Sequence, residues 1–159
     1  MEFFSSPEFF DFITKIGLGI IAWFVSITLH ECGHAVVGKL LGLSLAEFEV
    51  SLYGGYCRFK DSEHSEAVFD NPRCAMAIYA AGGLVNLVLA LTLLGIAWHT
   101  GFGAYDGILT IAGGANALLV LSILFSFTDP MSDFSQVRDA WAAYRKENES
   151  SDYHWPSKP

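Results

Sequence analysis

Charged residues are scarce in this sequence. Only 16% of its 159 residues are Asp, Glu, Lys or Arg, against about a quarter in soluble globular domains, whereas 52% are hydrophobic. This composition excludes intrinsic disorder and argues against a water-soluble enzyme. Lys and Arg number 9 against 17 Asp and Glu, so no basic surface is available and nucleic acid is not expected as a partner. The composition indicates a membrane protein, and the length indicates one compact unit.

Cysteine is also rare. Cys32, Cys57 and Cys74 are widely spaced, odd in number and without a CxxC pair, so neither a disulfide framework nor a thiolate zinc site is expected. The first eleven residues contain no Lys or Arg, and no small-residue cleavage site follows the first apolar run. A cleaved signal peptide is therefore not expected, and this run should remain in the mature protein.

Three long apolar stretches contain no proline. They cover residues 12–41, of which 12–29 are the most apolar, then 74–98 and 107–128. Each is long enough to cross about 30 Å of hydrocarbon, which takes roughly 20 helical residues. We therefore predict an all-α membrane protein with a core of three transmembrane helices.

The distribution of Lys and Arg predicts how these spans are oriented. Residues 43–73 and the C-terminal tail carry most of the cations, whereas residues 99–106 carry none and the N-terminal flank has only Lys15. Cytoplasmic loops are enriched in Lys and Arg. We therefore expect the N-terminus outside, and residues 43–73 and the C-terminus in the cytoplasm. The cations on the predicted cytoplasmic side are Arg58, Lys60, Arg73, Arg138, Arg145, Lys146 and Lys158.

Two smaller elements are predicted outside the spans. Alternating apolar residues and Gly54-Gly55 indicate a β-hairpin over about residues 47–60, with the two glycines as its turn and a polar loop over 61–73. Apolar residues at helical spacing predict a cytoplasmic amphipathic helix and polar tail over 133–159, with Ser132 or Asp133 as N-cap and the helix lying at the membrane interface. The membrane-embedded core would then cover residues 1–135.

The most informative segment is His30-Glu31-Cys32-Gly33-His34. Residues four apart share a helical face, so both imidazoles can reach one metal ion, while Glu31 can touch a bound water without being a ligand. Zinc makes such a water acidic enough to attack a carbonyl at neutral pH. Ionisable residues in a membrane span are costly and usually functional. The motif therefore predicts a zinc centre with Glu31 as general base.

A third ligand must lie at the same membrane depth. The first and third spans run in the same direction, so the end of the third span meets the motif, and Asp129 and Asp133 follow it. We favour Asp133, since Asp129 directly precedes Pro130 and suits the turn. His64 is an outlying candidate more typical of a surface residue, and His99 belongs to the opposite side of the membrane.

At this point the chain resembles the site-2 protease family of intramembrane zinc metalloproteases. The resemblance rests on HECGH at 30–34, on Ala81-Gly82-Gly83-Leu84-Val85-Asn86, and on Pro130-x-x-Asp133, and it covers about residues 12–135. The chain departs from the family where Gly83 replaces a proline, Ser132 a leucine and Phe134 a glycine.

The resemblance implies one Zn²⁺ per chain, held by His30, His34 and Asp133, with Glu31 as general base. It also implies that Asn86 is an active-site polar residue near the substrate backbone, although a lone Asn in a membrane helix also serves helix packing. The substrate would be a transmembrane protein cleaved near the cytoplasmic face of what we expect to be a bacterial cell membrane. A homo-oligomer and a regulatory membrane partner are both left open.

Two other readings compete with this one. The first is a catalytically inactive membrane protein that keeps a structural or vestigial metal site and acts as a binding or scaffold module. The second is a membrane HExxH protease whose third ligand is a Glu on a later helix. Glu147 and Glu149 are the late candidates for that role, but both lie in a polar tail.

Overall fold

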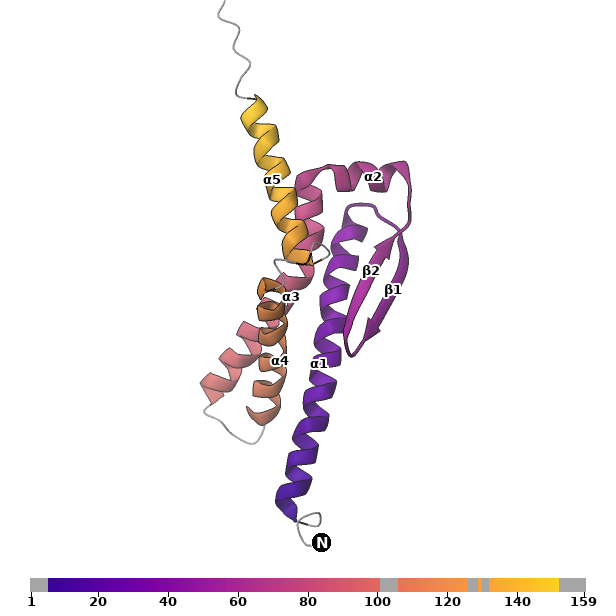
Figure 1. The fold of residues 1–159 in the computed structure, drawn as a ribbon. Helices are drawn as coiled ribbons and strands as arrows, with labels where there is room; N and C mark the ends of the chain where they lie inside the picture. The colour runs from indigo at the N-terminus through magenta and orange to yellow at the C-terminus, as the bar shows by residue number, and fades with distance from the viewer. Residues whose placement is uncertain (1–5, 101–105, 126–128, 130–131, 152–159) are drawn as a thin grey trace, which may run out of the picture.

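Helices make up most of the molecule, with one two-stranded sheet beside the longest helix (Figure 1). The computed structural model describes residues 6–100, 106–125, 129 and 132–151. The predicted end of the third span at 126–128 and the tail at 152–159 lie outside these residues. The elements in chain order are α1 (Pro7–Leu40), β1 (Leu45–Ser51), β2 (Gly54–Phe59), α2 (Glu63–Asp70), α3 (Pro72–Thr100), α4 (Asp106–Phe125) and α5 (Asp133–Ser151).

Helix α1 has a defined signal at each end. Ser6 is the N-cap, and its hydroxyl accepts a hydrogen bond from the Phe9 amide at 3.2 Å. At the other end Gly42 has a φ of +85°, and the Leu43 amide donates to the Gly38 carbonyl at 2.9 Å. This is a Schellman ending, which favours glycine at the left-handed position. The 34 residues between these ends form one helix, which includes nearly all of the predicted stretch 12–41.

Helices α3 and α4 pack against each other and against α1, and small residues allow close approach. A Cβ added at Gly33 of α1 would lie 2.9 Å from the Ala81 carbonyl oxygen of α3. A Cβ at Gly113 of α4 would lie 2.7 Å from Leu94 Cγ of α3. The backbones of the three helices are therefore close enough to bring groups from α1 and α3 into direct contact.

The β-hairpin forms, but its turn is not where the sequence indicated. Ser51 pairs with Gly54, so Leu52 and Tyr53 are the two connecting residues, while Gly54 and Gly55 begin β2. The predicted glycine turn is therefore wrong. The tip is attached to α1 by a hydrogen bond from Trp23 Nε1 to the Leu52 carbonyl at 3.0 Å. The backbone at Gly55 also passes close to Glu31 of α1. Both contacts join residues far apart in the sequence, so a local turn pattern could not indicate them.

The predicted polar loop over 61–73 is also wrong, because most of it is helix α2. Ser62 is its N-cap and forms a capping box with Ser65. Val68 of α2 joins a small core with Leu43, Phe59 and Ile78, which connects α2 to the hairpin and to α3. An eight-residue helix presents one short apolar stripe, so the polar composition of the segment concealed it.

Helix α5 carries the predicted amphipathic pattern and begins at Asp133. The Ser132 hydroxyl accepts a hydrogen bond from the Ser135 amide at 3.3 Å, so Ser132 is the N-cap. The helix packs on α3, and further along it the Arg73 guanidinium lies 5.0 Å from the centre of the Tyr144 ring. Figure 1 shows α5 extending beyond the end of the helix bundle.

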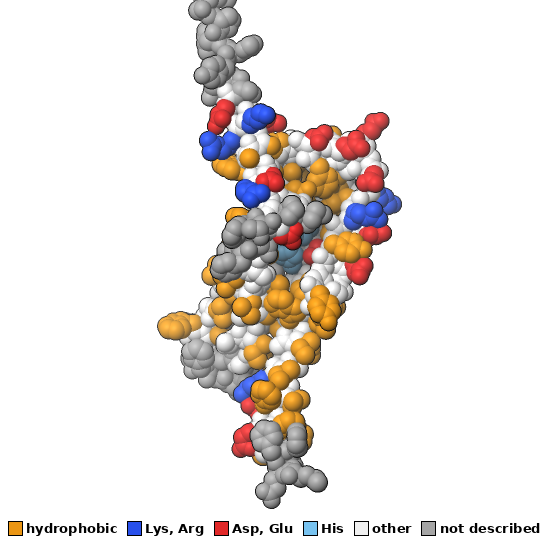
Figure 2. All heavy atoms as spheres, viewed as in Figure 1, with side chains coloured by type: hydrophobic (Ala, Val, Ile, Leu, Met, Phe, Trp, Pro, Cys, Tyr) orange, Lys and Arg blue, Asp and Glu red, His pale blue; other side chains and the backbone are white. Residues whose placement is uncertain are grey.

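Within the part of the chain that the structure describes, two helices, α1 and α3, are long and apolar enough to cross a membrane, while the apolar segment of α4, Gly107–Ile123, is shorter. Many large apolar side chains on α1 and α3 are exposed, including Ile20, Phe24, Val88 and Leu91. Figure 2 shows charged side chains gathered around α2, the hairpin and α5, whereas hydrophobic side chains cover much of α1 below them. One end of the molecule is therefore polar and the long helical part is apolar.

Candidate metal centre

His30 and His34 lie one turn apart on α1 and face the same region. Their ring centres are 4.8 Å apart, and the two Nε2 atoms are 3.2 Å apart. His34 is buried and His30 is half-buried. The helical spacing of the two residues therefore brings both imidazoles to one point, as the motif predicts.

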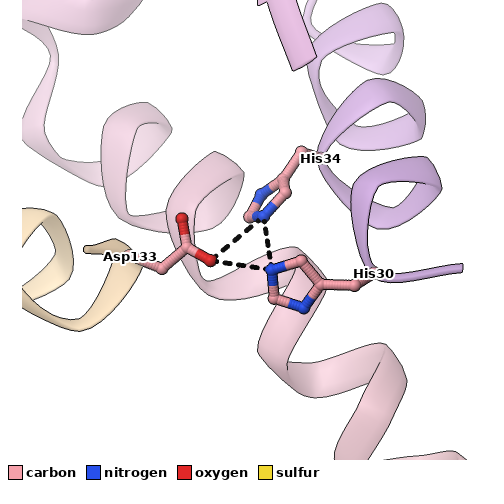
Figure 3. Close-up of side chains that lie close together, drawn as sticks. All are labelled: His30, His34 and Asp133. Atoms are coloured by element: carbon pink, nitrogen blue, oxygen red, sulfur yellow. Dashed lines mark hydrogen bonds and ion pairs between the residues drawn. The ribbon is translucent and has the colours of Figure 1, made fainter. Parts of the chain in front are cut away.

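Asp133 completes the cluster from the first residue of α5 (Figure 3). Its Oδ2 lies 2.9 Å from His30 Nε2 and 3.2 Å from His34 Nε2. One ligand atom from each of the three side chains lies within 4.8 Å of the others. Two imidazole nitrogens and one carboxylate oxygen are a donor set that suits catalytic zinc, which takes three protein ligands and keeps a fourth position open.

The charge of Asp133 suits a metal ligand. Burial by itself would raise the pKa of this carboxyl, but the hydrogen bonds to His30 and His34 outweigh burial and hold the pKa well below its ordinary value. The carboxyl is therefore ionised at neutral pH. By contrast, burial and the nearby Glu31 raise the pKa of the Cys57 thiol to about 11. The Cys57 thiol is therefore protonated at neutral pH.

Helix α3 supports both histidines from behind. His34 Nδ1 lies 2.7 Å from the Ile78 carbonyl oxygen, and His30 Nδ1 lies 3.2 Å from Asn86 Nδ2. Between these two positions, a Cβ at Gly82 would lie 2.4 Å from His34 Nε2 and 2.7 Å from His30 Nε2. The rings therefore occupy the space that any other residue type would fill at position 82.

Glu31 and the three candidate ligands line one cavity of about 1160 Å³. Glu31 is only 6% exposed. The strand β2 forms another wall of this cavity. A Cβ at Gly55 would lie 2.7 Å from Glu31 Cγ, so the strand passes directly beside this side chain. The cavity thus combines a carboxylate, a candidate metal centre and a strand.

The structure separates the other sequence candidates from this cluster. Asp129 is exposed, and its backbone carbonyl accepts a hydrogen bond from the Ser132 hydroxyl at 2.9 Å. His64 lies at the far end of α1, with Nε2 3.1 Å from the Leu41 carbonyl. His99 belongs to the last turn of α3. Asn86, in contrast, contacts the cluster, because it is fully buried against His30.

Sequence reasoning missed two contributors to the site. The Ile78 carbonyl is a backbone group, so no side-chain pattern could indicate it. Gly55 was assigned to a turn because paired glycines are typical of hairpins, although the structure needs a small residue there for contact with Glu31. Gly82 allows a close contact between α3 and α1 that includes both imidazoles.

An apolar helix with an HExxH face, joined by a distant aspartate, defines a metalloprotease-type centre in a helical protein with two candidate membrane helices. Residues 18–148 match the model of Peptidase family M50. The chain therefore belongs to this family, the site-2 protease family of zinc metalloproteases, as the sequence motifs suggested. The family is associated with membranes.

One curated relative is a Neisseria meningitidis serogroup A / serotype 4A protein named "Putative zinc metalloprotease". It is 30% identical over 111 residues, which cover 52% of this chain and 25% of the relative. The chain thus matches about a quarter of the length of that protein. No solved structure matches the chain.

Proposed function

We propose that this protein is an intramembrane zinc metalloprotease that hydrolyses a peptide bond of a membrane-embedded substrate near the cytoplasmic face. The observation that carries the proposal is the meeting of His30, His34 and Asp133 beside Glu31 in one cavity. These groups come from α1 and from the start of α5, which are about a hundred residues apart in sequence. Membership of the M50 family supports the same class of reaction.

Each residue of the centre has a separate role. His30, His34 and Asp133 would hold one zinc ion per chain. Zinc, when bound, would activate a water molecule and polarise the scissile carbonyl. Glu31 would accept the proton of the attacking water and pass it to the leaving amine. Its position beside Gly55 keeps the carboxylate within the cavity and close to the β2 wall.

The proposed orientation has three spans, formed by α1, α3 and α4, with the N-terminus outside and the C-terminus cytoplasmic. His30 lies fifteen residues beyond Lys15 on α1, which is about 22 Å along a helix and within the cytoplasmic third of a bilayer. Charged residues of α2, the hairpin and α5 gather at this end of the molecule. Water from the cytoplasm would therefore reach the cavity, as hydrolysis requires.

The substrate we propose is a transmembrane protein segment that unwinds locally. A helical substrate hides its peptide bonds in internal hydrogen bonds, so an extended stretch is needed before attack. The strand β2 lines the cavity over residues 54–59 and, among the described strands, pairs with β1 along one edge. An unwound segment could pair with its other edge by strand addition, which would hold a peptide bond near Glu31.

Glu31→Gln tests the catalytic role. We expect the purified variant to bind about one zinc per chain, as the wild type does, because the substitution leaves the three ligands in place. Cleavage of a model transmembrane peptide should fall by roughly 100-fold or more, since a general base contributes at least that factor. Cleavage would be followed by mass spectrometry, and bound zinc by elemental analysis. Wild-type zinc binding without any cleavage would favour the inactive-scaffold alternative.

The third ligand is tested by Asp133→Asn, with Asp129→Asn as its matched control. Asp133 lies within hydrogen-bonding distance of both histidines, whereas Asp129 is exposed and outside the cluster. We therefore expect a marked loss of zinc affinity in the first variant and none in the second. Release of zinc from Asp129→Asn alone, measured by chelator competition, would overturn this assignment.

A further inference from the structure

The candidate metal centre is one part of a longer cavity. At about 1160 Å³ this cavity is larger than the roughly 300–1,000 Å³ typical of sites for small molecules. At the polar end of the molecule it is lined by α2, including the exposed Glu66 and Asp70. On the other side of the metal centre it is lined by apolar side chains of α1 and α4. The volume suits a chain of several residues, and the two ends of the cavity differ in polarity.

Helix α1 forms the floor of the cavity with one stripe of side chains. Residues three or four apart share a helical face, and the cavity-lining residues of α1 repeat in this way: Trp23, Ile27, His30, Glu31 and His34. The two residues that precede the metalloprotease motif are apolar. Ile27 and Trp23 lie about 6 and 12 Å from Glu31 along the helix axis. The floor therefore continues from the proposed general base into an apolar part.

Helix α4 supplies one side of this apolar part. It runs in the same direction as α1, because each of the two helices is antiparallel to α3 (Figure 1). A Cβ at Gly19 of α1 would lie 3.9 Å from Ile111 Cγ2 of α4, so these residues lie at the same height. Eight residues further along each helix, Leu119 is therefore level with Ile27. Leu119 and Ile123 both line the cavity and are half-buried.

The hairpin supplies the opposite side. Figure 1 shows the hairpin and α4 on either side of α1. Gly54 and Gly55 line the cavity without side chains that would fill it, and the Trp23 indole holds the hairpin tip by its hydrogen bond to the Leu52 carbonyl. Figure 2 shows histidine atoms in a hollow on this face, with charged side chains above them and hydrophobic side chains below. The cavity is therefore a groove that leads from the apolar part of the molecule to its polar end.

We propose that the apolar part of this groove, formed by Trp23, Ile27, Leu119 and Ile123, is the docking surface for the membrane-embedded part of the substrate. The substrate lies lengthwise in the groove. Its residues on the membrane side of the scissile bond contact these four side chains, and its residues on the cytoplasmic side lie toward α2. This inference rests on the proposed protease function, because it assigns a direction to the substrate at the same site.

The groove suits a peptide better than a lipid chain. Its apolar part is continuous with the space around Glu31, so a chain bound there passes the reacting groups. The edge of β2 that faces away from β1 offers backbone groups to a peptide, whereas an acyl chain has no group to pair with them. An extended chain advances about 3.3 Å per residue, so the distance from Glu31 to Trp23 corresponds to roughly three or four residues. The substrate residues on the membrane side of the scissile bond should be apolar over that length.

Photocrosslinking in the purified full chain tests the docking surface. The photoreactive residue benzoylphenylalanine is placed at position 119 or 118 of the Glu31→Gln variant, which should bind a model transmembrane peptide without cleaving it. The protein is reconstituted in phosphatidylcholine vesicles. We expect position 119 to crosslink peptide residues on the membrane side of the bond that the wild type cleaves, as located by mass spectrometry. Position 118 is the matched control, because Leu118 is 58% exposed and does not line the cavity. It should crosslink lipid and no peptide above background.

A second measurement uses substitutions of the same two residues. Leu119→Trp adds volume to the groove and should raise KM for the peptide roughly 5- to 150-fold. The kcat and the zinc affinity should stay close to those of the wild type, because the substitution removes binding and leaves the reacting groups in place. Leu118→Trp should leave KM, kcat and zinc affinity unchanged, since its side chain faces away from the groove.

The possible outcomes separate this inference from the proposed function. Equal peptide crosslinking from positions 118 and 119, crosslinks from position 119 to lipid alone, or an unchanged KM in Leu119→Trp would overturn the docking surface, while cleavage by the wild type would still support the protease. Crosslinks from position 119 to the cytoplasmic side of the scissile bond would also overturn the inference. Peptide crosslinks confined to position 119, without cleavage by the wild type, would overturn only the protease function.

Discussion

At the scale of single residues, the candidate centre depends on glycine at position 82, which has no side chain. Position 82 on α3 faces both imidazoles, and only glycine leaves them room. Gly83, its neighbour, has a different environment, because among the described residues a Cβ there would meet only Ile123 Cδ1, at 3.9 Å. Two adjacent glycines of the same helix therefore differ in what they tolerate, and the sequence does not distinguish them.

The substitutions Gly82→Ala and Gly83→Ala test this difference between the two glycines. The first methyl group would lie 2.4 Å from His34 Nε2 and must displace a ring that Ile78 holds at 2.7 Å. Forcing extra volume into a packed site costs about 1–3 kcal/mol, which corresponds to roughly a 5- to 150-fold loss of zinc affinity. The second methyl group makes ordinary contact and should leave the affinity unchanged. Equal zinc affinities in titrations of the two variants would contradict this account.

At the scale of elements, α5 connects the polar end of the molecule to the metal centre. Asp133 is its first residue, and the helix is attached to the start of α3 about three turns later. There the Arg73 guanidinium lies over the Tyr144 ring, and Arg73 also donates to the Tyr144 hydroxyl at 3.4 Å. The position of the third ligand is thus linked to the docking of a whole helix.

Tyr144→Ala should loosen this docking. An exposed contact between a cation and an aromatic ring is worth about 0.5–1 kcal/mol, so the opening equilibrium of α5 should rise roughly two- to fivefold. Hydrogen exchange of the α5 backbone amides measures the change. Tyr144→Phe keeps the ring and should behave almost like the wild type. Equally fast exchange in both variants would assign the effect to the hydroxyl group rather than the ring.

Prediction of the elements from sequence succeeded where the pattern was long. Apolar runs without proline indicated α1, α3 and α4, because a helix of that length repeats its signal many times. It failed for α2, whose eight residues carry a single apolar stripe, and for the hairpin turn. In the hairpin, paired glycines suit a turn as well as a strand beside a helix, and local propensity cannot separate these uses.

At the scale of the whole molecule, the apolar helices and the polar end suggest a defined position in the bilayer. The proposed three spans predict that the two termini lie on opposite sides, whereas two spans would put them on the same side. The charge bias predicts a cytoplasmic C-terminus. The number of crossings and the orientation can therefore be tested together.

Single cysteines at Glu8 and Lys146, in a chain whose native cysteines are replaced by serine, provide this test. Both positions are exposed at opposite ends of the described chain. A membrane-impermeant maleimide should label position 8 in intact spheroplasts, and position 146 only after permeabilisation. Retained zinc binding would show that the replacements leave the protein folded. Labelling of both positions from the same side would contradict the three-span arrangement.

The sequence by itself determined the apolar helices and the pairing of His30 with His34, because both depend on neighbours within a turn of the chain. The sequence favoured Asp133 over Asp129 without excluding either. The tertiary structure brings Asp133 to these histidines across 103 residues, leaves Asp129 outside, and places Asn86 and Gly82 of α3 behind the rings. Such contacts depend on how closely and at what height helices pack. Those quantities arise from the summed packing of many side chains, and no local pattern encodes them.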